Sequence, residues 1–367
     1  MYKSLCVTIL ALGILNNVYT QSSETQKNMW LDAKIHYGTI LPHYTFMNYI
    51  TSKHQKGIEM SLRTQCNTYT LSSFLYRYPR YGIGLNHTSL GNPEKIGNTT
   101  VLFGIFDVPV FHRKHVSLLY QCNLGAAYIH KPLSSNIHNI AMSNSYNFFI
   151  GIDLQAEYRI GKKHAIRTGI DASHISNGKI TTPNLGYNSI SANCSYIYTL
   201  HKTPTDFTLY NTYSISPVNM YTITASGGIK SDEYLSSEHF PTASLNIEYH
   251  RIFNMKYGLI IGTDMFYDNA KQAKNSVWKE EINGGIHAGV EAFYVPFSFT
   301  IQTGWYLIHK PEQHATYQRI ALRYYGLQSY TIQFGLKSHM TTADFLEIGI
   351  GYTLPNIRKH VSQIEHN

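Results

Sequence analysis

Segments of about ten residues that alternate apolar and polar side chains recur along the chain from residue 30 onward. This period-two alternation is typical of strands with one apolar face, and no apolar run after residue 30 is long enough for a transmembrane helix. The sequence therefore predicts an all-β chain. The predicted strands are 30–41, 56–66, 80–90, 100–108, 115–130, 147–159, 164–176, 187–200, 219–231, 241–252, 256–267, 280–294, 297–308, 315–325, 329–338 and 343–354.

The breaks between these strands alternate between short turns and long polar loops. Outer-membrane barrels have short periplasmic turns and longer extracellular loops, so the pattern predicts an antiparallel transmembrane outer-membrane β-barrel of roughly 12–16 strands. The break at 67–79 is long where a short turn is expected. The short turns are 161–163, 253–255, 295–296 and 327–328, and the long loops are 131–146, 177–187, 232–240 and 268–279.

The amino-terminal residues have the composition of a secretory signal peptide. Lys3 precedes an apolar run over residues 5–15, and cleavage before Gln21 is expected; the run is short for a bilayer-spanning anchor, which is the alternative. The predicted organisation is a signal peptide at 1–20, a single barrel domain at 21–354 and a polar carboxyl-terminal tail at 355–367. The stretch 201–218 has the weakest strand pattern and is the only plausible boundary between domains.

Composition separates a membrane barrel from a soluble β-sandwich, which shows the same alternation. Charged residues make up only 14% of the chain and there are 30 tyrosines, which together with the signal peptide and the loop asymmetry favour the barrel. The formal charge of +8 either attracts an anionic partner, such as phosphorylated lipid rather than nucleic acid, or keeps loops solvated.

The cysteines predict no metal site. Cys66, Cys122 and Cys194 are scattered and odd in number, so they are interpreted as small apolar strand residues, with a Cys66–Cys122 disulfide as the alternative. No metal or cofactor is expected. Two polar clusters have bland interpretations. His339, Asp344 and Glu347 are expected to lie at a solvated loop and strand end, with a second polar site as the alternative. Asp264 and Asp268 are expected to be loop caps, with a cation site as the alternative.

The pattern His-x-Ser occurs four times and is uninformative by itself. Only the phase of the strand at 164–176 selects one copy: His174 and Ser176 continue an apolar row of alternate residues that faces lipid. Asn188 heads the apolar row of the next strand and is expected to lie opposite His174. If the amino terminus is periplasmic, this cluster lies at the extracellular rim. The copies are His87/Ser89, His115/Ser117, His174/Ser176 and His360/Ser362.

These residue types suit nucleophilic catalysis. A histidine two residues away on the same face can accept the proton of a serine hydroxyl, so Ser176 is the candidate nucleophile and His174 its base. The Asn188 amide oxygen would orient the imidazole but, being uncharged, would stabilise an imidazolium less than a carboxylate does. Oxyanion donors are expected from the backbone around Asn177 and Gly178 or from the Asn184 amide.

The runs HISNG at 174–178 and PNLG at 183–186 resemble the active-site signature of the outer-membrane lipid A 3-O-deacylase family, also described as acyloxyacyl hydrolase-like. The resemblance spans about residues 30–354 and is strongest at 120–200. It implies a β-barrel whose Ser-His-Glu triad cleaves an ester-linked acyl chain from lipopolysaccharide, with Ser176, His174 and Asn184 as nucleophile, base and oxyanion contributor. The family's glutamate falls on Asn188, which leaves a working Ser-His-Asn variant, a borrowed acid or an inactive site as alternatives.

The sequence thus predicts a bacterial outer-membrane esterase that acts on lipid A by Ser-His catalysis. Its expected partners are lipopolysaccharide of the outer leaflet and the membrane itself, with no nucleic acid, and its expected state is a monomer or homodimer. A non-enzymatic channel or adhesin with a degenerate site is the rival hypothesis, and a soluble secreted β-sandwich that binds polysaccharide is a third.

Overall fold

The computed structural model describes residues 28–51, 53–65, 70–201, 216–231, 238–269, 282–308, 314–340, 342–355 and 357. The predicted signal peptide at 1–20 lies outside these residues, as does the tail at 355–367 apart from Pro355 and Ile357. No helix within the described ranges is long and apolar enough to cross a membrane.

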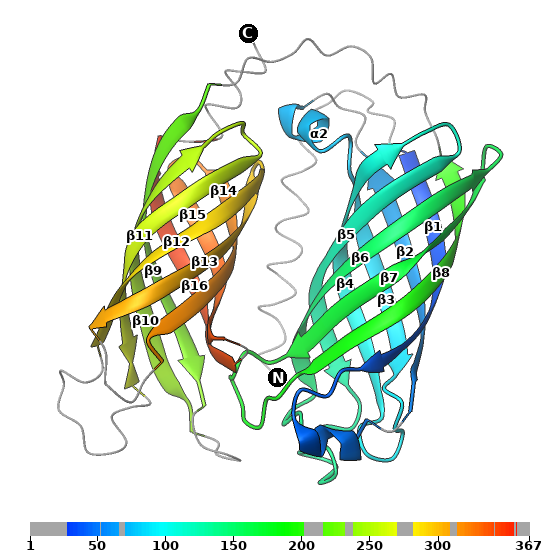
Figure 1. The fold of residues 1–367 in the computed structure, drawn as a ribbon, viewed down its shortest axis with the longest axis horizontal. Coiled ribbons are helices and arrows are strands. Elements are labelled where there is room, and N and C mark those ends of the chain that lie inside the picture. The colour runs from blue at the N-terminus through cyan, green and yellow to red at the C-terminus, as the bar shows by residue number, and fades with distance from the viewer. Residues whose placement is uncertain are drawn as a thin grey trace.

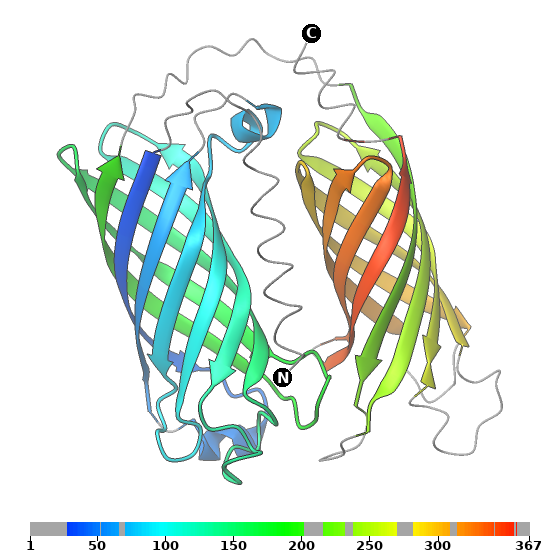
Figure 2. The same ribbon diagram turned by 180° about the vertical axis from the view of Figure 1, so that it is seen from behind.

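The strands close into two antiparallel barrels of eight strands each, which lie side by side (Figure 1, Figure 2). In the first barrel β8 pairs back with β1, and in the second β16 pairs back with β9. The first barrel contains β1 (Asn28–Ile40), β2 (Gln55–Gln65), β3 (Arg80–Ser89), β4 (Asn98–His112), β5 (Val116–Ile129), β6 (Tyr146–Ile160), β7 (His164–Ser176) and β8 (Tyr187–His201). The second contains β9 (Val218–Lys230), β10 (Phe240–Ile252), β11 (Tyr257–Asp268), β12 (Ile282–Tyr294), β13 (Phe297–Ile308), β14 (Thr316–Leu327), β15 (Tyr330–His339) and β16 (Thr342–Leu354).

All predicted strands are present, but the single barrel predicted for 21–354 is wrong. The division between the barrels falls between His201 and Val218, where the strand pattern is weakest. Alternation specifies which face of a strand is apolar but not which strand it pairs with. Eight strands already enclose an interior that side chains can fill, so each half of the chain closes by itself.

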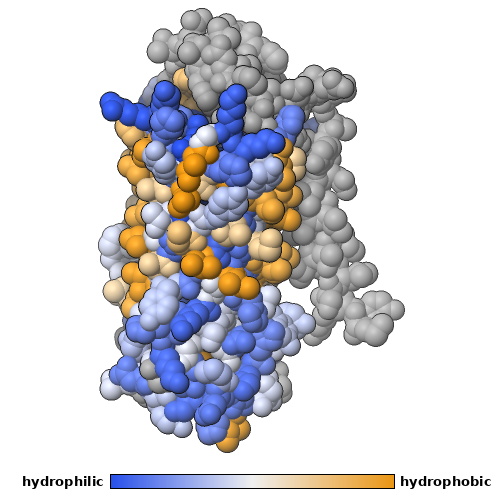
Figure 3. All heavy atoms as spheres, turned by 90° about the vertical axis from the view of Figure 1, so that its right-hand side faces the viewer, coloured by the Kyte–Doolittle hydropathy of each residue, from blue (hydrophilic) through white to orange (hydrophobic). Residues whose placement is uncertain are grey.

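The barrels are apolar outside and polar inside, which is the arrangement of a membrane barrel and the reverse of a soluble sandwich. Ile348 and Ile350 on the outer surface of the second barrel are 63% and 67% exposed. On the face of the first barrel seen in Figure 3, apolar residues form a belt between polar ends. Arg63 and Arg167, by contrast, are almost completely buried in the interior. The predicted transmembrane β-barrel class is therefore confirmed.

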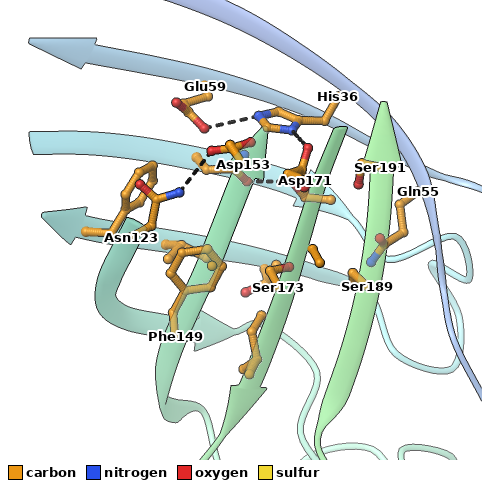
Figure 4. Close-up of a pocket in the computed structure, with 18 of the residues that line it drawn as sticks. His36, Gln55, Glu59, Asn123, Phe149, Asp153, Asp171, Ser173, Ser189 and Ser191 are labelled. Carbon is orange, nitrogen blue, oxygen red and sulfur yellow. Dashed lines mark hydrogen bonds and ion pairs between the residues drawn. The ribbon is translucent and has the colours of Figure 1, made fainter. Parts of the chain in front are cut away.

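Ion pairs fill the interior of the first barrel. Arg63 lies 2.9 Å from Asp32 and 2.8 Å from Asp107, and Arg167 bridges Asp107 and Glu157 at 3.1 and 2.6 Å. Nearer the loops, the His36 ring lies between two carboxylates, 3.1 Å from Glu59 and 3.2 Å from Asp171 (Figure 4). The cavity beside it holds only about 60 Å³.

The second barrel has a similar charged interior. Asp264, Asp268, Asp344 and Glu347, which were expected at solvated strand ends and loop caps, form ion pairs in this interior. Asp264 pairs with Arg319 at 2.9 Å and with His287 at 2.6 Å, and Glu347 also pairs with Arg319, at 2.8 Å. Asp268 and Asp344 pair with Lys230 at 2.6 and 3.0 Å. The inward phase of these strand residues, rather than their closeness to strand ends, decides their environment.

A short helix occupies the break at 67–79 that did not fit the turn pattern. Helix α2 (Leu71–Leu75) begins after Thr70, whose hydroxyl accepts a hydrogen bond from Ser73 N–H. Leu71 is buried in a cluster with Val218, Met220 and Phe293 of the second barrel. The additional residues of this break thus form a helix that contacts the second barrel.

The cysteines in strands are unpaired thiols. Cys122 and Cys194 are free and exposed on the outer surface, in agreement with their interpretation as small apolar strand residues. Cys66 lies outside the described residues.

Candidate functional site

Strands β7 and β8 bring three predicted site residues to one end of the first barrel, on its outer surface. Ile166, Ile170 and Ala172 of β7 alternate with inward residues, and His174 and Ser176 continue this outward row. In the antiparallel register His174 lies directly opposite Asn188. The outward phase and the opposite pairing both agree with the sequence prediction.

His174 is hydrogen-bonded to Asn188 within a chain of side chains that extends to the first loop. Nδ1 of His174 lies 2.6 Å from Oδ1 of Asn188. The Asn188 amide nitrogen in turn lies 3.3 Å from Nδ1 of His43, and Nε2 of His43 lies 2.9 Å from the backbone oxygen of Leu185. His43 follows β1 and was not among the residues selected from the sequence.

This chain of contacts is consistent with only one set of donors. A carbonyl oxygen can only accept, so His43 donates from Nε2 to Leu185 and its Nδ1 accepts from the Asn188 amide nitrogen. Asn188 then presents its oxygen to His174, which must donate from Nδ1. In the neutral imidazole, Nε2 of His174 is then the unprotonated nitrogen, as a general base requires.

Ser176 lies at the end of β7 and is 7% exposed. Its Oγ accepts a hydrogen bond of 3.2 Å from the backbone N–H of Gly178. Among the described residues no hydrogen bond joins Ser176 to His174. Ser176 and His174 lie on the same face of β7, but the Ser176 hydroxyl is hydrogen-bonded to the loop backbone and not to the imidazole.

The residues expected to bind an oxyanion divide into two groups. The Asn177 N–H is already used, since it donates to Oδ1 of Asn184 at 3.0 Å, and the Asn177 amide donates to Thr181 at 2.8 Å. Asn177 therefore shapes the loop. Asn184 accepts from Asn177 with its amide oxygen, and the Gly178 N–H is the donor that reaches Ser176 Oγ.

A neighbouring loop holds the 177–186 loop in place. Leu185 N–H donates to Ala141 O at 2.9 Å, Ser143 N–H donates to Pro183 O at 3.0 Å, and the buried Tyr187 hydroxyl donates to Asn139 at 2.7 Å. These contacts belong to a packed apolar cap that includes Ile40, Met47, Ile129, Met142 and Tyr187. The site is thus built on fixed loops.

Gly186 lies against the His174 ring. Its φ is +78°, and a Cβ at this position would lie 2.7 Å from Cε1 of His174. Only glycine allows the loop to pass this close to the imidazole. The spacing of Gly186 from His174 in the sequence gives no sign of this contact.

The described parts of the chain contain no group of three or more His, Cys, Asp or Glu side chains that could hold a metal ion. The chemistry available at the rim is that of a hydroxyl, an imidazole and amides.

Together, the two barrels and the outward His174–Ser176–Asn188 cluster define an outer-membrane β-barrel protein with a candidate hydrolytic site at the loop end. The model of the family lipid A 3-O-deacylase (PagL) matches residues 56–197, and the model of the acyloxyacyl hydrolase C-terminal domain matches residues 219–356. These matches account for most of the first barrel and all strands of the second. The chain belongs to the PagL-like lipid A 3-O-deacylase family.

Solved structures show weaker similarity. The crystal structure of the outer membrane enzyme PagL is 15% identical over 45% of this chain and 97% of its own, with a TM-score of 0.33. OccK5 of Pseudomonas aeruginosa is 10% identical over 90% of this chain and 98% of its own, with a TM-score of 0.23. A BenF-like porin from Pseudomonas fluorescens is 9% identical over 90% of this chain and 99% of its own, with a TM-score of 0.24. No curated protein matches the chain.

Proposed function

We propose that this protein is a carboxylic ester hydrolase that removes an ester-linked acyl chain from lipid A, with Ser176 as nucleophile. The observation that carries the proposal is the 2.6 Å contact between His174 Nδ1 and Asn188 Oδ1, which leaves Nε2 free on the face of Ser176. Membership of the lipid A 3-O-deacylase family supplies the substrate class. Lipid A would reach the site directly, because the row that carries the dyad faces the membrane.

In the acylation step, Oγ of Ser176 attacks the ester carbonyl carbon while Nε2 of His174 accepts the hydroxyl proton. The Gly178 N–H and the Asn184 amide nitrogen donate to the developing oxyanion. When the carbon–oxygen bond to the sugar breaks, His174 returns the proton to the leaving alkoxide. An acyl-Ser176 ester and a lipid A molecule with a free hydroxyl result.

Deacylation reverses these roles with water. His174 takes a proton from water, the hydroxide adds to the acyl carbonyl, and the proton returns to Oγ of Ser176 as the fatty acid leaves. Contacts between a base and its nucleophile often tighten only when substrate is bound. The Gly178 N–H, which holds Oγ at 3.2 Å, would then pass from the hydroxyl to the carbonyl oxygen.

His43 explains how an amide can serve where the family has a carboxylate. A carboxylate accepts with either oxygen, but an asparagine must present its oxygen and not its nitrogen to His174. His43 supplies that restraint by accepting from the Asn188 amide nitrogen at 3.3 Å. Asn188 thus orients the imidazole, and the oxyanion donors provide more of the charge stabilisation. We assign the working Ser-His-Asn variant rather than a degenerate site.

Mass spectrometry of lipid A tests the proposal. Lipid A from cells that produce the protein should lose one acyl chain, and cells that produce Ser176→Ala should retain it while the variant assembles in the outer membrane. A channel or adhesin would leave lipid A unchanged in both strains. Deacylation that persists in the Ser176→Ala strain would exclude Ser176 as the nucleophile.

A further inference from the structure

The second barrel contacts the loop that carries the proposed oxyanion donors. Leu346, an outward residue of β16, packs so closely on Gly178 that a Cβ there would lie 2.3 Å from its Cγ. Gly178 is the residue whose N–H donates to Ser176 Oγ. A side chain of the second barrel therefore touches the backbone that binds the proposed nucleophile.

The next residue of the loop is held as well. The N–H of Ser231, just after β9, donates to the backbone oxygen of Lys179 at 2.9 Å. Lys179 has a φ of +69°, which is unusual for a residue with a Cβ. Two consecutive loop residues, Gly178 and Lys179, are thus restrained by β16 and by the residue that follows β9. In Figure 1 and Figure 2 this loop, in green, reaches toward the second barrel.

On the other side of Ser176 the barrels meet through aromatic rings. Phe148 is the register partner of Ser176 on β6, and its ring centroid lies 5.5 Å from that of Phe334 on β15. Phe334 is half-buried, whereas Ile332 on the same face of β15 is 40% exposed. Phe148 keeps 39% of its surface exposed, so the aromatic pair is open to the membrane.

A second contact at the opposite end of the barrels holds them together. The ring of Tyr76, which ends α2, lies 5.5 Å from that of Tyr294 at the end of β12. The Lys256 ammonium lies 4.5 Å from the Tyr76 ring. Because the barrels touch at both ends, the contact at the site is part of an extended interface.

We propose that the second barrel is a working part of the active site. Leu346 is a positioning residue that holds Gly178, and the Ser231 N–H holds Lys179, in the conformation that binds Ser176 and the oxyanion. Phe334, with Phe148, forms the wall along which the scissile acyl chain lies, so the second barrel contributes to chain-length selectivity. This proposal rests on the proposed function. It gives the second barrel, which lacks the catalytic signature, a role in the same reaction.

The test compares purified full-length variants on lipid A substrates that differ in acyl-chain length, with released fatty acid measured. Leu346→Ala should lower kcat by about tenfold or more with little change in KM, because the donors that stabilise the transition state are displaced. Leu346→Met should restore most of the rate. Ile348→Ala is the matched control on the same face of β16 and should behave as the wild type.

For the wall, Phe334→Ala should change the ratio of kcat/KM between long and short chains by about tenfold or more, because one methylene contact in an apolar pocket discriminates by about tenfold or more. Ile332→Ala on the same strand face should leave the ratio unchanged. Heat-modifiable migration on gels confirms that each variant is folded.

Distinct outcomes separate this proposal from the proposed function. If Ser176→Ala abolishes release but Leu346→Ala and Phe334→Ala match their controls, the role of the second barrel is refuted while the esterase assignment stands. Faster release by Leu346→Ala would also refute it, because the second barrel would then shield the site. Unchanged release by Ser176→Ala would overturn the esterase assignment itself.

Discussion

Nδ1 of His174 lies 2.6 Å from Oδ1 of Asn188, and the register of two strands creates this contact. The residues are 14 apart in sequence but directly opposite in the β7–β8 pair. Both side chains lie on the outward, membrane-facing side of their strands. Polar groups are unfavourable in such apolar surroundings unless they are hydrogen-bonded, as these two are to each other. An amide oxygen thus takes the position in which a carboxylate would fix the imidazole tautomer.

The first prediction concerns His43. His43→Ala should lower kcat by about two- to tenfold, the equivalent of one neutral hydrogen bond, because the Asn188 amide would lose the contact that selects its orientation. Asn188→Asp should retain at least the wild-type rate, since either carboxylate oxygen can accept from His174. Steady-state kinetics of fatty-acid release provide the measurement.

The double variant distinguishes this role from general support of the loop. In the Asn188→Asp background, His43→Ala should cost less than about twofold, because a carboxylate does not need to be oriented. An equal loss in both backgrounds would mean that His43 acts on the fold of the loop and not through the amide.

The second prediction concerns Gly186. Gly186→Ala should reduce activity by about a hundredfold, because the added methyl group would meet His174 Cε1 at 2.7 Å and displace the imidazole. Gly161 also has a positive φ, of +72°, but nothing lies within 4 Å of the position of its Cβ. Gly161→Ala therefore controls for backbone strain and should remain active. Similar losses in both variants would attribute the effect to strain alone.

The third prediction concerns the interior of the first barrel. Arg167→Ala should destabilise the protein by about 3–5 kcal/mol, because Asp107 and Glu157 would keep buried charges with fewer partners. Arg159 lies 3.8 Å from Glu157 and its side chain is 28% exposed, so Arg159→Ala should cost less than about 1 kcal/mol. Urea unfolding in detergent, followed by tryptophan fluorescence, compares them. Equal midpoints would show that the ion pair contributes no stability.

Strand positions and faces were predictable because period-two alternation is local. The outward phase of His174 and Ser176, and their alignment with Asn188, follow from the positions of two strands and one loop. Barrel closure was not predictable in this way, since the return pairing of β8 with β1 joins residues far apart in sequence. The break at 67–79 was too long for a short turn, but neither helix α2 nor the contact of Leu71 with the second barrel was predicted.

Residues that reach the candidate site through tertiary contacts were missed for the same reason. His43 is 145 residues from Asn188, and no spacing rule connects the two. Leu346 belongs to an ordinary apolar strand row, and only the docking of the barrels gives it a distinct environment. Asn177 was expected to donate to an oxyanion, but its N–H is taken by Asn184.

Mass analysis of the acyl-enzyme tests the central claim most directly. Purified protein is mixed with lipid A, quenched in acid within one turnover, digested and examined by peptide mass spectrometry. The account predicts that the peptide containing Ser176 gains the mass of one acyl group, and that His174→Ala, which removes the base, suppresses this adduct. Acyl release without any adduct on Ser176, or an adduct on another residue, would contradict it.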